Sequence, residues 1–109
     1  MFPKGMGGNM GGLVKQAQKM QQQMMKLQEE LNAREVSAQS GGGMVEATVN
    51  GRGELLKLRL EREVIDPDDA EMLSDLIVAA VGEAQRRAQE MVQSEMGKVT
   101  GGMNIPGLI

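Results

Sequence analysis

The feature that most constrains the fold of this chain is a mismatch between two long helical stretches and three short strands. The apolar stripes of the two helices run for roughly 20 to 30 residues each, and the strands between them are far shorter. A sheet of three short strands cannot cover both stripes. The uncovered apolar surface must meet a second copy of the chain or another partner, so we expect an obligate assembly.

The first predicted helix covers residues 13–34 and carries a narrow apolar seam. Its apolar residues alternate between steps of four and three, the period of a coiled-coil seam, and they are Leu13, Ala17, Met20, Met24, Leu27 and Leu31. Good helix formers fill nearly every other position. Residues 1–12, rich in Gly and Met, are expected to form a flexible leader.

Three short strands are predicted to follow as an antiparallel meander. The first two span residues 35–40 and 44–49 and are separated by three glycines. Asn50-Gly51 predicts a tight hairpin turn, because both residues tolerate positive φ. The return strand is expected to have one apolar and one polar face, with Leu56, Leu58 and Leu60 inward and Lys57 and Arg59 outward.

The second predicted helix starts with Asp66 as N-cap and Pro67 in its first turn, and it continues to Met96 with Gly97 as C-cap. Its first half is apolar around most of the circumference, so we expect it to be buried between the sheet, the first helix and a dimer partner. The predicted core and dimer residues are Leu56, Leu58, Leu73, Leu76, Ile77, Ala80 and Val81. Residues 13–97 therefore form one α+β domain, and residues 98–109 an irregular tail.

Composition argues against several function classes. The chain has no Cys and no His, which removes disulfides, thiolate metal sites and the commonest general base. Gly97-Lys98 lacks the flanking residues of a phosphate-binding loop. We expect no enzyme activity, catalytic residue, metal, cofactor or small-molecule substrate. The sequence shows neither the pattern of a signal peptide nor an apolar run long enough to span a membrane. We therefore expect a cytoplasmic protein that does not bind membranes.

Charge is distributed unevenly although the net charge is −3. Residues 1–28 carry four lysines and no acidic residue, whereas residues 29–90 carry 14 acidic and 7 basic residues. A basic helix end with its positive dipole favours a phosphate backbone as partner. The candidate DNA-binding residues are Lys4, Lys15, Lys19, Lys26 and Lys98, which the predicted topology gathers at one end. A solvated lysine face would give the same pattern.

Three further features have two interpretations each. The glutamines of the first helix could bind phosphates or base edges, or form its neutral outer face. The 11 methionines could line a groove or a copper site, although their helical spacing favours core filling. The acidic cluster that begins at Asp66 could bind a divalent cation, but helix capping explains it more simply.

Four stretches of the chain, within residues 15–31, 42–51, 66–81 and 97–107, match one known pattern in order. Together they resemble the YbaB/EbfC family of bacterial nucleoid-associated proteins. Residues 15–21 and 27–31 resemble its first helix, and Gly42-Gly43-Met44-Val45 with Val49-Asn50-Gly51 resembles its central hairpin. Asp66-Pro67 with residues 72–81 resembles the start of its second helix, and residues 97–107 its closing segment. The resemblance covers nearly the whole chain in order.

The resemblance implies a tweezer-like homodimer with projecting helical arms that binds double-stranded DNA with limited sequence preference and alters its conformation. It also implies nucleoid association, with roles in chromosome organisation, gene expression or DNA protection. It implies no catalytic residues.

Two other functions fit the residues. A prefoldin-like holdase or coiled-coil adaptor would grip protein partners with exposed Met side chains. A peripheral membrane protein would use the basic first helix on anionic lipid, although its apolar stripe is narrow for that purpose.

Overall fold

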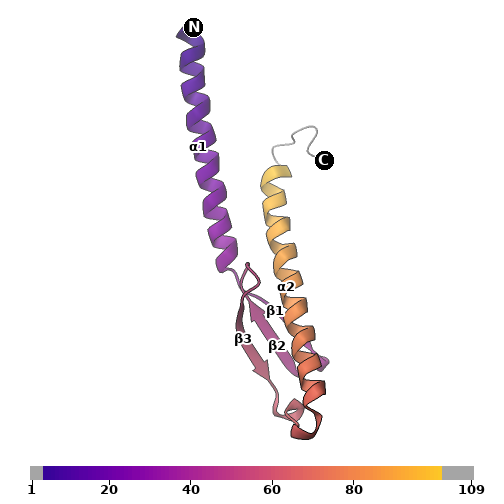
Figure 1. Ribbon diagram of the computed structural model, residues 1–109. Helices are drawn as coiled ribbons and strands as arrows, with labels where there is room; N and C mark the ends of the chain where they lie inside the picture. Colours follow the sequence, from indigo (N-terminus) through magenta and orange to yellow (C-terminus); the bar gives the residue numbers. More distant parts are fainter. Residues whose placement is uncertain (1–3, 102–109) are drawn as a thin grey trace. The chain divides into compact units, whose positions relative to one another are not determined.

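The computed structural model describes the backbone of residues 4–101 and the side chains of residues 11–99 (Figure 1). The elements, in chain order, are α1 (Lys4–Ala33), β1 (Val36–Ser40), β2 (Val45–Val49), β3 (Leu55–Leu60) and α2 (Ala70–Gly101), with 3-10 turns at Gly41–Gly43, Arg62–Val64 and Pro67–Asp69. This order confirms the predicted α+β class of helix, three strands and helix. Contacts divide the chain into two compact parts, one up to Glu30 and one from Leu31 onward, and each is described separately.

Helix α1 begins at Lys4, so the prediction of a flexible leader over residues 1–12 is wrong for the described residues 4–12. The Gly-rich composition suggested the leader, because Gly costs about 1 kcal/mol per residue in a helix relative to Ala. Extending an existing helix adds one hydrogen bond for each residue that is fixed, without a new nucleation step. The stable helix that follows can therefore carry these glycines.

Helix α2 continues through Gly97 to Gly101, so Gly97 is not the predicted C-cap. The Lys98 Nζ donates to Glu95 Oε1 at 3.3 Å, an i,i+3 pair across this position. Such pairs support a helix, and a basic residue in the last turn favours its dipole. The predicted irregular tail therefore does not begin at Lys98, and its residues 102–109 lie outside the described residues.

The start of the second helical region is as predicted. The Asp66 Oδ1 accepts a hydrogen bond from the Asp68 backbone N–H at 3.0 Å, with Pro67 at the first position. The Asp69 Oδ1 accepts from the Met72 N–H at 3.2 Å. These carboxylates thus act as caps, which is the simpler of the two interpretations of the acidic cluster.

The three strands form an antiparallel sheet in the order β1-β2-β3. One face is polar, as predicted: the Ser37 and Thr48 hydroxyls share a 2.7 Å hydrogen bond. On the same face, the amide of Gln39 donates to the Glu46 carboxylate at 3.0 Å. This face does not form the core.

The core lies between the other face of the sheet and α2. Three alanines spaced four residues apart on α2, Ala80, Ala84 and Ala88, are fully buried. Their small side chains allow α2 to lie close to β1 and β2, which it covers (Figure 1). The sheet contributes Ala38, Val45, Ala47 and Val49 to the same core.

Most of the predicted core residues lie at this interface. Ala80 is buried, and the partly buried residues packed against the core include Leu58, Leu73, Leu76, Ile77 and Val81. Leu56 does not point into the core: its side chain is 53% exposed. An irregularity at Thr48/Val49 shifts the pairing of β3 there, so simple alternation fails. The place of Leu56 in a dimer interface stays a prediction.

The β2–β3 hairpin is present, but not as the tight turn expected from Asn50-Gly51. The Asn50 N–H donates to Glu54 O at 3.1 Å, which closes a longer loop. The glycine with positive φ is Gly53, at 81°, and not Gly51. Gly51 has a different role: its N–H donates to Asn32 O at 3.2 Å, in the last turn of α1.

Candidate nucleic-acid interface

Three of the predicted DNA-binding residues form a stripe on α1, which we call the lysine stripe: Lys15, Lys19 and Lys26. At 3.6 residues per turn, Lys19 and Lys26 lie within about 40° of Lys15 around the helix axis. Along the axis the stripe extends about 16 Å. All three side chains are exposed. The continuous helix therefore aligns these charges on a single face.

The lysine stripe lies on the side of α1 opposite the apolar seam. The seam residues from Leu13 to Leu31 lie within about 40° of Leu13, while Lys15 is about 200° away. The seam can therefore pack against another helix without covering the lysines. Leu13 and Val14 are 63% and 53% exposed in the single chain, so part of this helix is available to a partner.

Within the described residues, none of the three stripe lysines has an ion-pair or hydrogen-bond partner. Helix α1 carries no acidic residue before Glu29. A hollow of about 500 Å³ lies along the same stretch, lined by Lys15, Gln16, Lys19, Met20 and Gln23. Unpaired ammonium groups beside neutral amide donors suit an anionic ligand such as a phosphate.

The other two predicted lysines are placed differently. Lys4 is the first residue of α1, and its side chain lies outside the described side chains. Lys98 pairs with Glu95, whose carboxylate also lies 3.7 Å from the Arg34 guanidinium. Lys98 is thus partly neutralised. Its gathering with the lysines of α1 stays a prediction.

Most of the arginines form ion pairs with acidic side chains. Arg59 lies 3.7 Å from Glu46 and also binds Glu61, and Arg86 binds both Glu83 and Glu90. Arg87 contacts Glu83 at 3.2 Å. Exposed pairs of this kind add little stability, but they neutralise the arginines as sites for an anion.

The Glu83 carboxylate is the best-connected acid among the described residues. Hydrogen bonds from Arg86, supported by Coulomb attraction and by Arg87, lower the pKa of Glu83 below its usual value of 4.5. The same contact raises the pKa of Arg86. Both groups therefore stay charged at neutral pH, which makes this cluster structural rather than a proton-transfer site.

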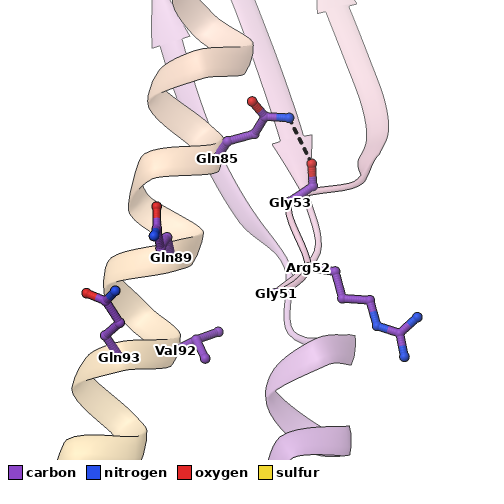
Figure 2. Close-up of a pocket in the computed structure, with 7 residues that line it drawn as sticks. All are labelled: Gly51, Arg52, Gly53, Gln85, Gln89, Val92 and Gln93. Carbon is purple, nitrogen blue, oxygen red and sulfur yellow. Dashed lines mark hydrogen bonds between the residues drawn. The ribbon is translucent and has the colours of Figure 1, made fainter.

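The sequence interpretation missed a second hollow, beside the β2–β3 hairpin. It has a volume of about 320 Å³ and is lined by Gly51, Arg52, Gly53, Gln85, Gln89, Val92 and Gln93 (Figure 2). The Gln85 Nε2 donates to Gly53 O at 3.0 Å and ties α2 to the hairpin. The spacing of the three glutamines, every fourth residue, was visible in the sequence. Their position opposite the hairpin was not.

Within residues 11–99, no group of three acidic, His or Cys side chains is arranged to hold a metal ion. Neither helix, over its described length, combines the length and apolar character that a membrane crossing requires.

Comparisons with known proteins decide the family. The model of the YbaB/EbfC DNA-binding family matches residues 6–103. The chain belongs to the YbaB/EbfC DNA-binding family. The family resemblance predicted from the sequence is thus confirmed, and the family is one of DNA-binding proteins.

Relatives within the YbaB/EbfC family are similar over nearly their whole length. A nucleoid-associated protein of Alkaliphilus metalliredigens is 57% identical over 98% of this chain and 95% of its own length. A nucleoid-associated protein of Pelotomaculum thermopropionicum is 52% identical over 94% of this chain and 98% of its own.

The fold is also found among solved structures. One example is that of the uncharacterized protein HP0035 from Helicobacter pylori, with a TM-score of 0.59 and 24% sequence identity. The match covers 73% of this chain and 93% of that chain.

Proposed function

We propose that this chain forms a homodimer that binds double-stranded DNA with weak sequence specificity and alters its conformation. Its roles would be nucleoid organisation, regulation of gene expression and DNA protection, in the cytoplasm at the nucleoid. Membership of a DNA-binding family and the nucleoid-associated names of the relatives support this proposal.

The lysine stripe is the observation that carries the proposal. Lys15, Lys19 and Lys26 share one face of α1, are exposed and lack acidic partners within the described residues. Binding of several phosphates by such side chains releases counterions, which is the main source of sequence-independent affinity for DNA. The protein is acidic overall, but screening over about 8 Å lets local charge dominate at a DNA surface.

The weak specificity follows from the kind of side chains available. Sequence is read mainly by bidentate contacts from Arg, Asn or Gln to base edges, while lysines mostly bind phosphates. The stripe offers lysines, and the glutamines beside it are neutral donors that bind phosphates or bases. Phosphate contacts would therefore dominate, and DNA shape would modulate them.

Exposed apolar residues in the part from Leu31 onward support a homodimer. Leu55 and Leu56 on β3 are 48% and 53% exposed, Ile65 after β3 is 53% exposed, and Val78 on α2 is 71% exposed. Val78 lies about 200° around α2 from Ala80, on the side away from the core. Each such side chain contributes about 1.5–3 kcal/mol when fully buried, which would favour association.

Binding to a mixed-sequence duplex of about 30 base pairs, titrated across salt concentration, tests the proposal. If the dimer neutralises about 4 to 8 phosphates, the log–log plot of affinity against salt has a slope of roughly −4 to −7. Repeating the titration with a second, unrelated duplex should change the affinity little. Absence of binding even at low salt would contradict the proposal, and suppression of protein aggregation without any effect of DNA would favour a holdase instead.

A further inference from the structure

The β2–β3 hairpin presents an arginine that the ion-pair network of the protein does not use. Among residues 11–99, four of the six arginines have acidic partners, and Arg52 and Arg62 have none. Arg52 is exposed and lies at the hairpin between two glycines. Its side chain leaves the hairpin on the side away from α2 (Figure 2).

The backbone around Arg52 is held in place by a dense set of hydrogen bonds. The Asn50 Oδ1 accepts from the N–H groups of Arg52 and Glu54, at 2.9 and 3.0 Å. The Gly53 N–H donates to Asn50 O at 2.9 Å, while the Gln85 amide binds Gly53 O. Because the loop is ordered before binding, Arg52 can meet a ligand with little loss of backbone entropy.

The acidic residue of the hairpin is occupied by another partner. The Glu54 Oε1 accepts a hydrogen bond from Asn50 Nδ2 at 2.9 Å and makes no ion pair with Arg52. The Arg52 guanidinium therefore keeps its five donors for an external group. Its planar fork matches two oxygens of a phosphate, which suits a nucleic-acid backbone.

The hollow between the hairpin and α2, which Arg52 also lines, adds neutral donors. Gln89 and Gln93 lie one turn apart on α2, both are exposed, and their side-chain amides have no hydrogen-bond partner among the described residues. Gly51 and Gly53 of the hairpin line the same hollow. Amide donors of this kind commonly bind phosphate and sugar oxygens.

We infer that Arg52, together with Gln89 and Gln93, forms a second contact for the DNA backbone, separate from the lysine stripe. This contact rests on the proposed DNA binding and adds to it a site at the hairpin. Each protomer contributes one guanidinium, so a dimer neutralises two further phosphates there. The glutamines fix the position of the backbone without adding charge.

Salt titrations of DNA binding by the Arg52→Ala and Arg62→Ala variants test the contact. Arg62 is a matched control, because it is the other arginine without an acidic partner and lies beyond the far end of β3. Loss of two phosphate contacts makes the slope for Arg52→Ala less steep by roughly 2, with affinity at least about tenfold weaker at low salt. Arg62→Ala keeps the slope of the unmodified protein.

Two further variants separate charge from structure. Glu54→Gln keeps the acceptor for Asn50 but removes a negative charge beside the contact, so it should tighten DNA binding. Gln89→Ala with Gln93→Ala should weaken binding without changing the salt slope, because the lost donors are neutral. Thermal unfolding by circular dichroism checks that each variant is folded, and Arg52→Lys should restore the slope.

The outcomes distinguish this inference from the proposed function. If the unmodified protein binds DNA and Arg52→Ala has the same slope and affinity as Arg62→Ala, the hairpin contact is refuted while DNA binding stands. If the unmodified protein binds no DNA at any salt concentration, the proposed function and the hairpin contact are both refuted.

Discussion

Gly51 shows how one residue controls the packing of the hairpin against the end of α1. A Cβ atom at this position would lie 2.0 Å from Leu31 O and 2.7 Å from Leu31 C. Both are backbone atoms, so no side-chain rotation can relieve the clash. The Gly51 N–H also donates to Asn32 O. Only glycine therefore permits this approach.

We predict that Gly51→Ala lowers the free energy of unfolding by about 2–4 kcal/mol, because it adds overpacking and strains the hydrogen bond from the Gly51 N–H to Asn32 O. Denaturant unfolding measures the change. Gly82→Ala is the matched control: a Cβ there meets nothing within 4 Å, and Gly82 lies inside α2. The free energy of unfolding of the Gly82→Ala variant should rise by about 0.5–1 kcal/mol. Equal stability of the two variants would contradict the close-approach argument.

The cluster of Glu83, Arg86 and Arg87 predicts that the stability of the protein depends on pH. Arg86 and Arg87 lower the pKa of Glu83 in the folded protein, so the charged form is favoured there. A group with a lowered folded pKa stabilises the protein above its unfolded pKa, and this contribution disappears as pH falls through the folded value. The contribution is therefore present at neutral pH and is lost below about pH 4.5.

We expect Glu83→Gln to lower the melting temperature slightly at neutral pH, and we expect this difference to shrink as the pH falls below about 4.5. Because the pair is exposed, the difference at neutral pH should be small. Melting curves between about pH 3 and 7 measure it. A difference that stays constant over this range would show that the substitution acts through packing and not through charge.

At the scale of elements, α1 separates its two surfaces. The apolar seam and the lysine stripe lie on opposite sides of the helix, so a change on one side should leave the other unaffected. This separation predicts that a substitution can remove the proposed DNA binding without removing the proposed dimer.

The variant Lys15→Glu with Lys19→Glu should therefore abolish DNA binding while the dimer persists. It reverses two unpaired charges per protomer on the face that we propose for phosphates. Fluorescence anisotropy with a labelled duplex and analytical ultracentrifugation measure the two properties. As a control that reverses one charge per protomer, Lys57→Glu changes an exposed lysine on β3 that also lacks an acidic partner among the described residues. Normal DNA binding by the double variant would show that the lysine stripe is not the binding surface.

Helix α2 likewise presents two sides with different expected responses. Ala80 is fully buried against the sheet, so Ala80→Asp should unfold the protein by burying an unpaired charge. Val78 is 71% exposed, so Val78→Asp should leave the chain folded and weaken the dimer. Circular dichroism and sedimentation separate these results. Ser94→Asp, on an exposed position of α2, should affect neither property, and a folded Ala80→Asp variant would contradict the core described above.

At the scale of the whole molecule, the sequence predicted the class of fold well because the signals are local. The seam from Leu13 to Leu31, the glycine break after β1 and the Asp66-Pro67 cap each depend on neighbouring residues. Such local signals can be recognised in the sequence without knowledge of distant contacts. The helix ends were missed at Lys4 and Gly97, because helix propagation overrides the low propensity of individual glycines.

The candidate site was only partly accessible from the sequence. The four lysines of residues 1–28 were visible as a charge pattern, and helical geometry explains why three of them share a face. Arg52 was not singled out from the sequence. It stands out only by comparison with the other arginines, most of which have acidic partners. The structure shows that Arg34 and Arg59 contact the carboxylates of Glu95 and Glu46 on other elements. Arg86 and Arg87 instead pair with acidic residues three or four positions away on α2.

The sequence by itself determined the order of the elements, the polar and apolar faces and the basic character of α1, because these follow from periodicity and local charge. Only the tertiary structure decided that Gly51 serves close packing rather than positive φ, and that Leu56 stays exposed. It also placed the glutamines of α2 opposite the hairpin. These features depend on contacts between segments far apart in the chain, which no local pattern of residues encodes.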